Sequence, residues 1–154
     1  MINNDILRRL RFVFDYQNAK MIKIFAKVNH EVSQELLLNM LKKEEEEGYQ
    51  PCNDKTMCQF LDGLIIEKRG LREGAEIPEP VSQINNNLTF KKLRVALEMR
   101  EDDIISTLAL ADFNMSKSEL GALFRKPGHK HFKECGDQVL RNFLAGLSVK
   151  HRGK

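Results

Sequence analysis

The sequence predicts an all-α protein that consists of two tandem copies of a small four-helix unit packed together. Residues 3–70 align with residues 86–153 at a constant offset, without a gap. Apolar residues recur at helical spacing in both copies, and neither copy shows the sustained alternation or the Asn-Gly turns that are typical of β-strands. A constant offset with a matched apolar pattern indicates one structural unit that is used twice.

Equivalent positions of the two copies share polar as well as apolar residues. Identical pairs include Asn3 and Asn86, Asn4 and Asn87, Leu10 and Leu93, Ser33 and Ser116, Cys52 and Cys135, Asp54 and Asp137, Phe60 and Phe143, and Gly63 and Gly146. We therefore place the first repeat at residues 1–70, a linker at residues 71–85 and the second repeat at residues 86–154. Two prolines predict an irregular linker. A unit this small is only marginally stable alone, so we expect the two copies to pack together.

Four helices are expected in each repeat. In the first repeat they lie near residues 4–15, near residues 18–28, after an N-cap at Ser33, and after an N-cap at Asn53 or Asp54. The fourth helix carries the apolar stripe of a core-facing helix, formed by Met57, Phe60, Leu61, Leu64 and Ile65, and matched by Leu140, Phe143, Leu144 and Leu147. Glycine costs a helix ~1 kcal/mol relative to alanine. Because Gly63 and Gly146 repeat this cost at one position, we predict a close helix crossing there.

The composition excludes several classes of protein. The 154 residues are 42% apolar and 31% charged, which is typical of a globular chain, and no apolar run approaches the ~20 residues that span a bilayer. The start of the chain lacks the features of a secretory signal, so we expect a cytoplasmic protein without membrane partners. The cysteines Cys52, Cys58 and Cys135 are too few for a disulfide framework and are interpreted as small buried groups.

The excess positive charge lies in the second half of the chain. Residues 1–74 contain 12 basic and 12 acidic side chains, whereas residues 86–154 contain 13 basic and 8 acidic ones. Such an asymmetry between two copies of one unit bears on the partners of each copy, because cationic surfaces attract phosphates.

Three segments carry a resemblance to a known family. They are residues 1–11 (MINNDILRRLR), residues 60–70 (FLDGLIIEKRG) and residues 123–130 (LFRKPGHK). These segments resemble the YehS-like family of uncharacterised bacterial proteins, in which a domain of unknown function (number 1456) occurs twice per chain. The resemblance covers nearly the whole chain and implies a bacterial cytoplasmic protein. It assigns no activity and no catalytic or binding residue.

A helix-turn-helix-like pair is expected in each repeat, and the pair in the second repeat is the stronger candidate. The pattern predicts a helix over residues 103–111, a turn over residues 112–115 and a second helix from Ser116. Helix-turn-helix proteins place that second helix in the major groove of DNA. The turn lacks the expected glycine, so we assign the left-handed backbone conformation to Asn114. The competing interpretation is an ordinary helix pair of a small bundle.

A basic cluster follows that helix. Arg125, Lys126, Lys130 and Lys133 surround a Pro-Gly turn, and two histidines lie between them. Cations gathered near a helix end suit phosphate contacts. The matching stretch of the first repeat is Lys-Lys-Glu-Glu-Glu-Glu at residues 42–47, which would repel phosphates. Two alternatives remain open: both loops are merely solvated, or the acidic and basic loops attract each other within a homodimer or within one chain.

Metal and enzyme chemistry are poorly supported. His129, His131 and Cys135 are zinc-ligand types, but a fourth ligand is missing and the first repeat has Glu46, Gly48 and Cys52 at the same positions. The chain has no glycine-rich phosphate loop, no nucleophile elbow and no HExxH motif. We therefore expect no metal, no cofactor and no enzymatic activity.

Nucleic-acid binding in a regulatory role is the leading functional hypothesis. It assigns phosphate contacts to Arg125, Lys126, Lys130 and Lys133, places Lys117 near the groove, and gives a phosphate contact to the backbone amide of Ser116. The partner would be DNA or RNA. The first alternative is a protein-interaction or adaptor module that uses a groove between the repeats. The second is an enzyme whose site forms only between the repeats.

Overall fold

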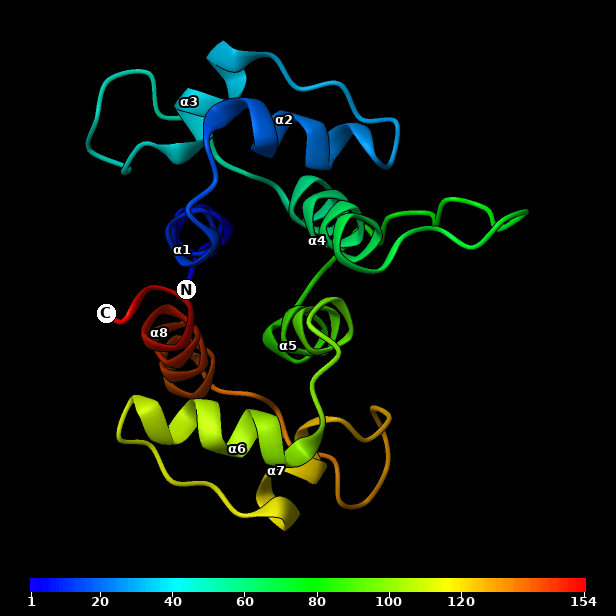
Figure 1. Cartoon of the computed structure of the whole chain (residues 1–154), viewed down its shortest axis with the longest axis vertical. Helices are drawn as coiled ribbons and strands as arrows, with labels where there is room; N and C mark the ends of the chain where they lie inside the picture. The colour runs from blue at the N-terminus through cyan, green and yellow to red at the C-terminus, as the bar shows by residue number, and fades with distance from the viewer. The chain divides into compact units, whose positions relative to one another are not determined.

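The chain forms eight α-helices and no strands in a computed structural model that describes residues 1–154 (Figure 1). The helices are α1 (Asn3–Phe14), α2 (Asn18–Ala26), α3 (Gln34–Leu41), α4 (Asp54–Arg69), α5 (Asn86–Ala96), α6 (Glu101–Leu110), α7 (Lys117–Leu123) and α8 (Asp137–Arg152). They divide into two compact units, Met1–Ile84 and Asn85–Lys154, with four helices each. The predicted all-α class and the tandem four-helix organisation are therefore confirmed.

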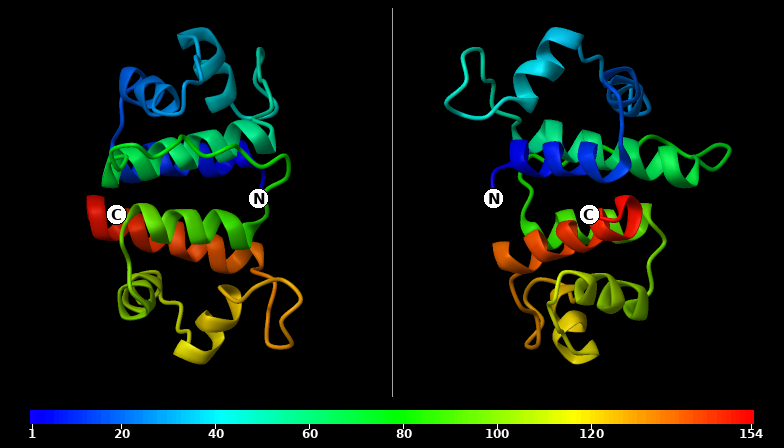
Figure 2. Two further views of the ribbon diagram at one scale, coloured as in Figure 1. Left: turned by 90° about the vertical axis from the view of Figure 1, so that its right-hand side faces the viewer. Right: turned by 60° about the vertical axis from the view of Figure 1, so that its left-hand side comes forward.

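The helices of the two units follow the same arrangement. In the first unit α2 packs on α4 and on α3, and α1 contacts both α3 and α4. In the second unit α6 packs on α8 and on α7, and α5 contacts α8. Figure 2 shows that within each unit the first and the last helix run alongside each other, and the two short helices lie across one side of that pair.

In the core of each unit, a phenylalanine of the last helix contacts a phenylalanine of another helix. In the first unit Phe25 of α2 lies 5.2 Å from Phe60 of α4, and in the second unit Phe90 of α5 lies 4.5 Å from Phe143 of α8, centroid to centroid. The equivalents of Phe25 and Phe90 are leucines in the other unit. The two repeats have thus exchanged a phenylalanine and a leucine between helices, which keeps the core volume nearly constant.

Side-chain caps begin four of the helices. Ser33 accepts from the Leu36 amide and Asn53 accepts from the Thr56 amide, so Asn53 rather than Asp54 is the cap of α4. The left-handed residue of the turn after α6 is Asp112, with a φ of 57°, and not Asn114 as the sequence led us to expect. Asn29, at the equivalent place after α2, has a φ of 59°. Both residue types tolerate this conformation because their short side chains bond locally.

Gly63 and Gly146 confirm the predicted close crossing. A Cβ atom at Gly63 would lie 2.1 Å from the Ile24 carbonyl oxygen in α2. A Cβ atom at Gly146 would lie 2.0 Å from the Thr107 carbonyl oxygen in α6. No side chain fits at such a distance from backbone atoms, so only glycine permits the fourth helix of each unit to approach the second so closely.

A buried asparagine holds the loop of the first unit to α1. The side-chain amide of Asn4 donates to the carbonyls of Met40 and Gln50 at 2.8 and 2.9 Å, and its oxygen accepts from the Cys52 amide at 3.0 Å. Asn4 is only 2% exposed. Its neighbour Asn3 donates to the Cys52 carbonyl at 3.0 Å. Two adjacent side chains thus satisfy a carbonyl in the last turn of α3 and several groups of the loop that follows it.

The second unit repeats this network. The amide of Asn87 donates to the carbonyls of Leu123 and Lys133 at 3.0 and 2.9 Å, and its oxygen accepts from the Cys135 amide at 2.9 Å. Asn86 donates to the Cys135 carbonyl at 3.1 Å. The difference lies in exposure, because Asn87 is half-buried whereas Asn4 is buried. The loop of the second unit is therefore less tightly covered at this point.

The segment between the repeats is irregular, as the prolines predicted, and belongs to the first unit. The amide of Val81 donates to the Cys58 sulfur at 3.5 Å, and the amide of Ile84 donates to the Asp54 carboxylate at 3.1 Å. Both acceptors are side chains of α4. The chain therefore returns along α4 before the second unit begins at Asn85.

None of the helices combines the length and the apolar content that crossing a bilayer requires. The three cysteines are buried and none of them forms a disulfide, which confirms that they act as small core groups.

Replacing Gly63 or Gly146 with alanine should destabilise the corresponding unit by about 3 kcal/mol, because the added methyl group overpacks a backbone crossing. Helix propensity alone predicts the opposite sign, a gain of ~1 kcal/mol. The matched control is Gly121→Ala in α7, where an added Cβ meets no atom within 4 Å. Urea unfolding should show a loss for the first two variants and a small gain for the third. A gain in all three would contradict the crossing.

Asn4→Asp should cost about 3–5 kcal/mol, because a buried carboxylate would then face two carbonyl oxygens without a donor of its own. Burial raises the folded-state pKa of the new carboxyl above its unfolded value of ~3.9, so the folded state binds the proton more tightly. The free energy of unfolding should therefore fall as the pH rises from about 4. Asn87→Asp should lose only about 1–2 kcal/mol because water reaches this half-buried position.

Candidate nucleic-acid interface

The expected helix pair is present in the second unit. Helix α6 contacts α7, and six residues separate them. Leu120 and Leu123 of α7 are buried, whereas Lys117, Ser118 and Glu119 are exposed. One side of α7 therefore faces solvent. The first unit contains the same pair in α2 and α3, so the pair is a standing part of the repeat and is not by itself a sign of DNA reading.

The start of α7 does not support the phosphate contact that we assigned to Ser116. The Ser116 backbone amide donates to the Glu119 carboxylate at 3.0 Å, and the Glu119 amide donates to the Ser116 hydroxyl at 3.1 Å. This capping box occupies the amide that a phosphate would need. Hydrogen bonds from Ser116 hold the pKa of Glu119 below its usual value, so a negative charge remains at this helix end at neutral pH.

Lys117 is also engaged. Its ammonium group lies 3.2 Å from the Asp102 carboxylate at the start of α6, although both side chains are largely exposed. An exposed pair of this kind contributes ~0–1 kcal/mol and can be exchanged for another anion. With Asp102 and Glu119 beside it, Lys117 lies in a mixed rather than a cationic surface.

The remaining four candidates lie together in the loop between α7 and α8, residues 124–136, which we call the basic loop. Arg125, Lys126, Lys130 and Lys133 are all exposed, and none of them is held in an ion pair within the chain. The loop contains one carboxylate, that of Glu134. The positive charge of Lys133 contributes to the lowered pKa of Glu119, but none of the four cations forms an ion pair, so the cluster is available to bind an external anion.

The basic loop is anchored at both ends. At its start the Phe124 ring lies 5.2 Å from the Phe90 ring, and the Arg94 guanidinium lies over it at 4.7 Å. At its far side the Lys133 amide donates to the Ala122 carbonyl at 3.0 Å, and the Asn87 side chain holds the Lys133 carbonyl. The cations thus project from a backbone with fixed contacts.

The middle of the basic loop forms a hydrogen-bonded turn. The His129 amide donates to the Lys126 carbonyl at 3.0 Å, and the Phe132 amide donates to the His129 carbonyl at 2.9 Å. The His131 amide donates to Nδ1 of His129 at 3.0 Å, and the two imidazole rings are 5.6 Å apart. Cys135 is buried instead of facing these rings, and the chain brings together no group of three metal-binding side chains.

The equivalent loop of the first unit, residues 42–53, has the opposite charge. We call it the acidic loop, because it contains Lys42 and Lys43 but four consecutive glutamates. Lys42 donates to the Glu47 carbonyl at 2.8 Å, and the Lys43 amide donates to the Glu46 carboxylate at 3.0 Å. In the acidic loop the ammonium group of Lys42 is thus held by a carbonyl of the same loop, and the four glutamates outnumber the two lysines.

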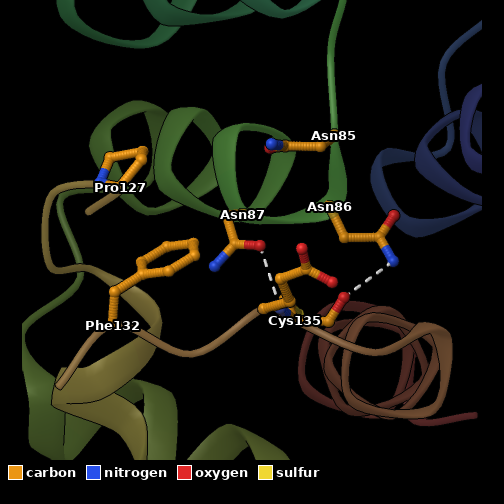
Figure 3. A pocket seen from close by; sticks show the side chains of 7 residues that line it. Asn85, Asn86, Asn87, Pro127, Phe132 and Cys135 are labelled. Atoms are coloured by element: carbon orange, nitrogen blue, oxygen red, sulfur yellow. Dashed lines mark hydrogen bonds between the residues drawn. The ribbon is translucent and has the colours of Figure 1, made fainter. Parts of the chain in front are cut away.

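A pocket of about 430 Å³ lies in the second unit between the start of α5 and the basic loop (Figure 3). Its lining consists of Asn85, Asn86, Asn87, Pro127, Phe132, Glu134 and Cys135. Figure 3 shows Pro127 and Phe132 on the side of the basic loop, facing the asparagines at the start of α5. The sequence did not indicate this pocket. The repeated asparagine pairs were the one available signal, because they mark where the loop meets α5.

The two cysteines beside the asparagine networks, Cys52 and Cys135, have raised thiol pKa values, so both thiols are protonated and poorly nucleophilic at neutral pH. Burial raises the pKa of the Cys52 thiol to about 12, with a further contribution from the Asp54 carboxylate. Burial and the Asp137 carboxylate raise the pKa of Cys135 to about 11. Thiols are nucleophiles and metal ligands as thiolates. At neutral pH these two sulfurs therefore act as packing groups.

Comparison with known proteins identifies the family. A family model described as "Protein of unknown function (DUF1456)" matches residues 3–70 and again residues 86–153. The chain belongs to the DUF1456 family. It is also similar to the "Uncharacterized protein YehS" of Escherichia coli (strain K12), with 45% identity over 154 residues that cover 100% of this chain and 99% of the relative. No solved structure matches. The two DUF1456 matches coincide with the two repeats, and neither description names an activity.

The thiols of Cys52 and Cys135 should react slowly with Ellman's reagent in the folded protein at pH 8, because only a minute fraction is ionised when the pKa is raised by burial. Unfolding in urea should expose all three cysteines to rapid reaction. Because the unfolded thiols ionise first, near pH 8.5, the free energy of unfolding should fall as the pH rises above that value. Fast reaction of the native protein would contradict the assignment.

Proposed function

We propose that this DUF1456 protein binds nucleic acid in the cytoplasm without catalysing a reaction, and that the basic loop makes the phosphate contacts. Four exposed cations, Arg125, Lys126, Lys130 and Lys133, support the proposal because no carboxylate of the chain is paired with them. A surface that neutralises several phosphates gains affinity by releasing the counterions that surround the nucleic acid.

We expect the basic loop, and not the start of α7, to make the main contacts with nucleic acid. In a helix-turn-helix reader the start of the second helix approaches the bases. Here that end carries the Glu119 carboxylate in a capping box, with Asp102 beside Lys117. Both carboxylates would repel a phosphate backbone at close range. Ser116 and Lys117 are accordingly secondary candidates, and the contact is expected to be mainly with phosphates instead of base edges in a groove.

The acidic loop provides an internal comparison. It occupies the same place in the repeat and is held by the same asparagine network, but its glutamates exclude a phosphate. The two loops therefore share their backbone support but differ in charge, so a comparison between them tests the effect of charge alone. A function that depends on the cations should disappear when they are removed from the second unit and should be insensitive to cations of the first unit.

The decisive measurement is a salt titration of binding to fluorescein-labelled duplex and single-stranded oligonucleotides, followed by anisotropy. The wild-type log–log slope should be about −0.9 per phosphate contact on duplex and about −0.7 per contact on a single strand. A variant with alanine at Arg125, Lys126, Lys130 and Lys133 should lose up to four contacts, so its duplex slope should become shallower by about 3–4 units.

The matched control removes the same number of positive charges elsewhere. Alanine at Lys23, Lys27, Lys43 and Lys55, all exposed residues of the first unit, changes the net charge equally. This control should retain the wild-type slope. Equal loss in both variants would show a nonspecific effect of net charge. Absence of binding at 20 mM salt would overturn the proposal and favour the protein-interaction alternative.

A further inference from the structure

We infer that the pocket beside the basic loop takes one unstacked base of a single-stranded nucleic acid, whose backbone the basic loop holds. The inference rests on the proposed function and adds the strand type to it. The volume of about 430 Å³ lies in the range of small-ligand sites, which is ~300–1,000 Å³. The pocket lies wholly within the second unit, because its lining begins at Asn85.

The corresponding place in the first unit is bridged by side chains. Arg8 donates to the Lys42 carbonyl at 2.8 Å and is also paired with Asp5, so it spans from α1 to the acidic loop. The Tyr49 hydroxyl donates to Asn4 at 3.3 Å and covers it further. These contacts explain why Asn4 is 2% exposed. The opening next to Asn87 is therefore a specific change in the second repeat and not a general feature of the fold.

In the second unit, the residues at the positions of Arg8 and Tyr49 do not cover the asparagine in this way. Lys91 stands where the first unit has Arg8, and its side chain is exposed. Phe132 stands where the first unit has Tyr49, so the hydroxyl that covers Asn4 has no counterpart. The Phe132 ring is half-buried and therefore keeps one part of its surface accessible. Substitution at two equivalent positions has thus uncovered an aromatic face.

The chemistry of the lining fits a base better than it fits a phosphate. Phe132 and Pro127 supply apolar surface on which a flat ring can stack. The oxygen of Asn85 caps the Leu88 amide, which leaves its amide group as a donor, and Glu134 adds an acceptor. A base presents a π-face surrounded by donors and acceptors. A bare phosphate would instead be repelled by the Glu134 carboxylate.

The cations of the basic loop favour a nucleic-acid base over other flat polar ligands as the occupant of the pocket. Lys126 and Lys130 lie on either side of Pro127 and His129 in the turn that borders the pocket, and Lys133 adjoins Phe132. Cations that surround an aromatic pocket are the combination with which proteins hold single strands, because the charges follow the backbone and the ring stacks a base. A duplex offers the same phosphates but keeps its bases stacked, so it cannot fill the pocket.

The chain contains no tryptophan, so Phe132→Trp places a single indole reporter in the pocket. A fluorescein-free 12-nucleotide DNA strand of mixed sequence should quench its emission in a saturable manner, and the matching 12-base-pair duplex should not. The control is Tyr49→Trp at the equivalent position of the first unit, whose emission should stay constant with both probes. Circular dichroism establishes that both variants are folded.

Affinity provides the second measurement. Phe132→Leu keeps an apolar side chain but removes the ring, and should weaken single-strand binding about 5- to 150-fold, while duplex binding stays within about twofold. Phe132→Tyr should restore single-strand affinity because the ring returns. Strand binding by anisotropy without tryptophan quenching, or equal loss for strand and duplex, would overturn the pocket but leave the proposed function intact. No binding of either nucleic acid would overturn both.

Discussion

The contact of a glycine with a carbonyl group of a neighbouring helix is the constraint on which each unit of this protein depends. Gly63 lies against the Ile24 carbonyl and Gly146 against the Thr107 carbonyl, at separations that exclude any side chain. The crossing sets the distance between the second and fourth helices. The same fourth helices carry Phe60 and Phe143, which are fully buried in the two cores. A helix-weakening residue is retained in both copies because the packing requires it.

The two repeats differ in one way at their core positions and in another way at their surface positions. Inside, the exchange of Leu7 and Phe25 for Phe90 and Leu108 moves an aromatic ring to another helix while the pair stays in contact with the fourth helix. On the surface, the acidic and basic loops differ by several charges, yet equivalent asparagine side chains hold both of them by hydrogen bonds. Core positions are constrained by volume, whereas solvated loop positions are free to acquire a new partner.

The sequence predicted the elements of the fold well because its signals were local and repeated. The offset between copies, the Ser33 cap and the glycine crossing all follow from residue type and spacing. The Ser116–Glu119 capping box was equally legible, since serine followed by glutamate three residues later is its signature, but the basic residues nearby drew the interpretation toward a phosphate. Asp112 was missed because asparagine and aspartate both tolerate the left-handed region.

The candidate pocket could not be predicted in this way. It depends on whether the side chain at position 91 reaches the loop as Arg8 does, and on the absence of one hydroxyl at Phe132. Both are tertiary facts about reach and exposure, which a single sequence does not encode at any fixed spacing. Charge could be counted from the sequence, but the availability of a charge depends on its partners, as the pairing of Lys117 with Asp102 shows.

The return of the inter-repeat segment along α4 means that the unit copied in evolution is shorter than the unit that folds. The family match stops at Gly70, yet Val81 and Ile84 cover the Cys58 sulfur and the Asp54 carboxylate. Excising the first repeat at its family boundary would remove the Val81 amide from the Cys58 sulfur and the Ile84 amide from Oδ2 of Asp54, while Oδ1 of Asp54 would keep its bond from Asn3.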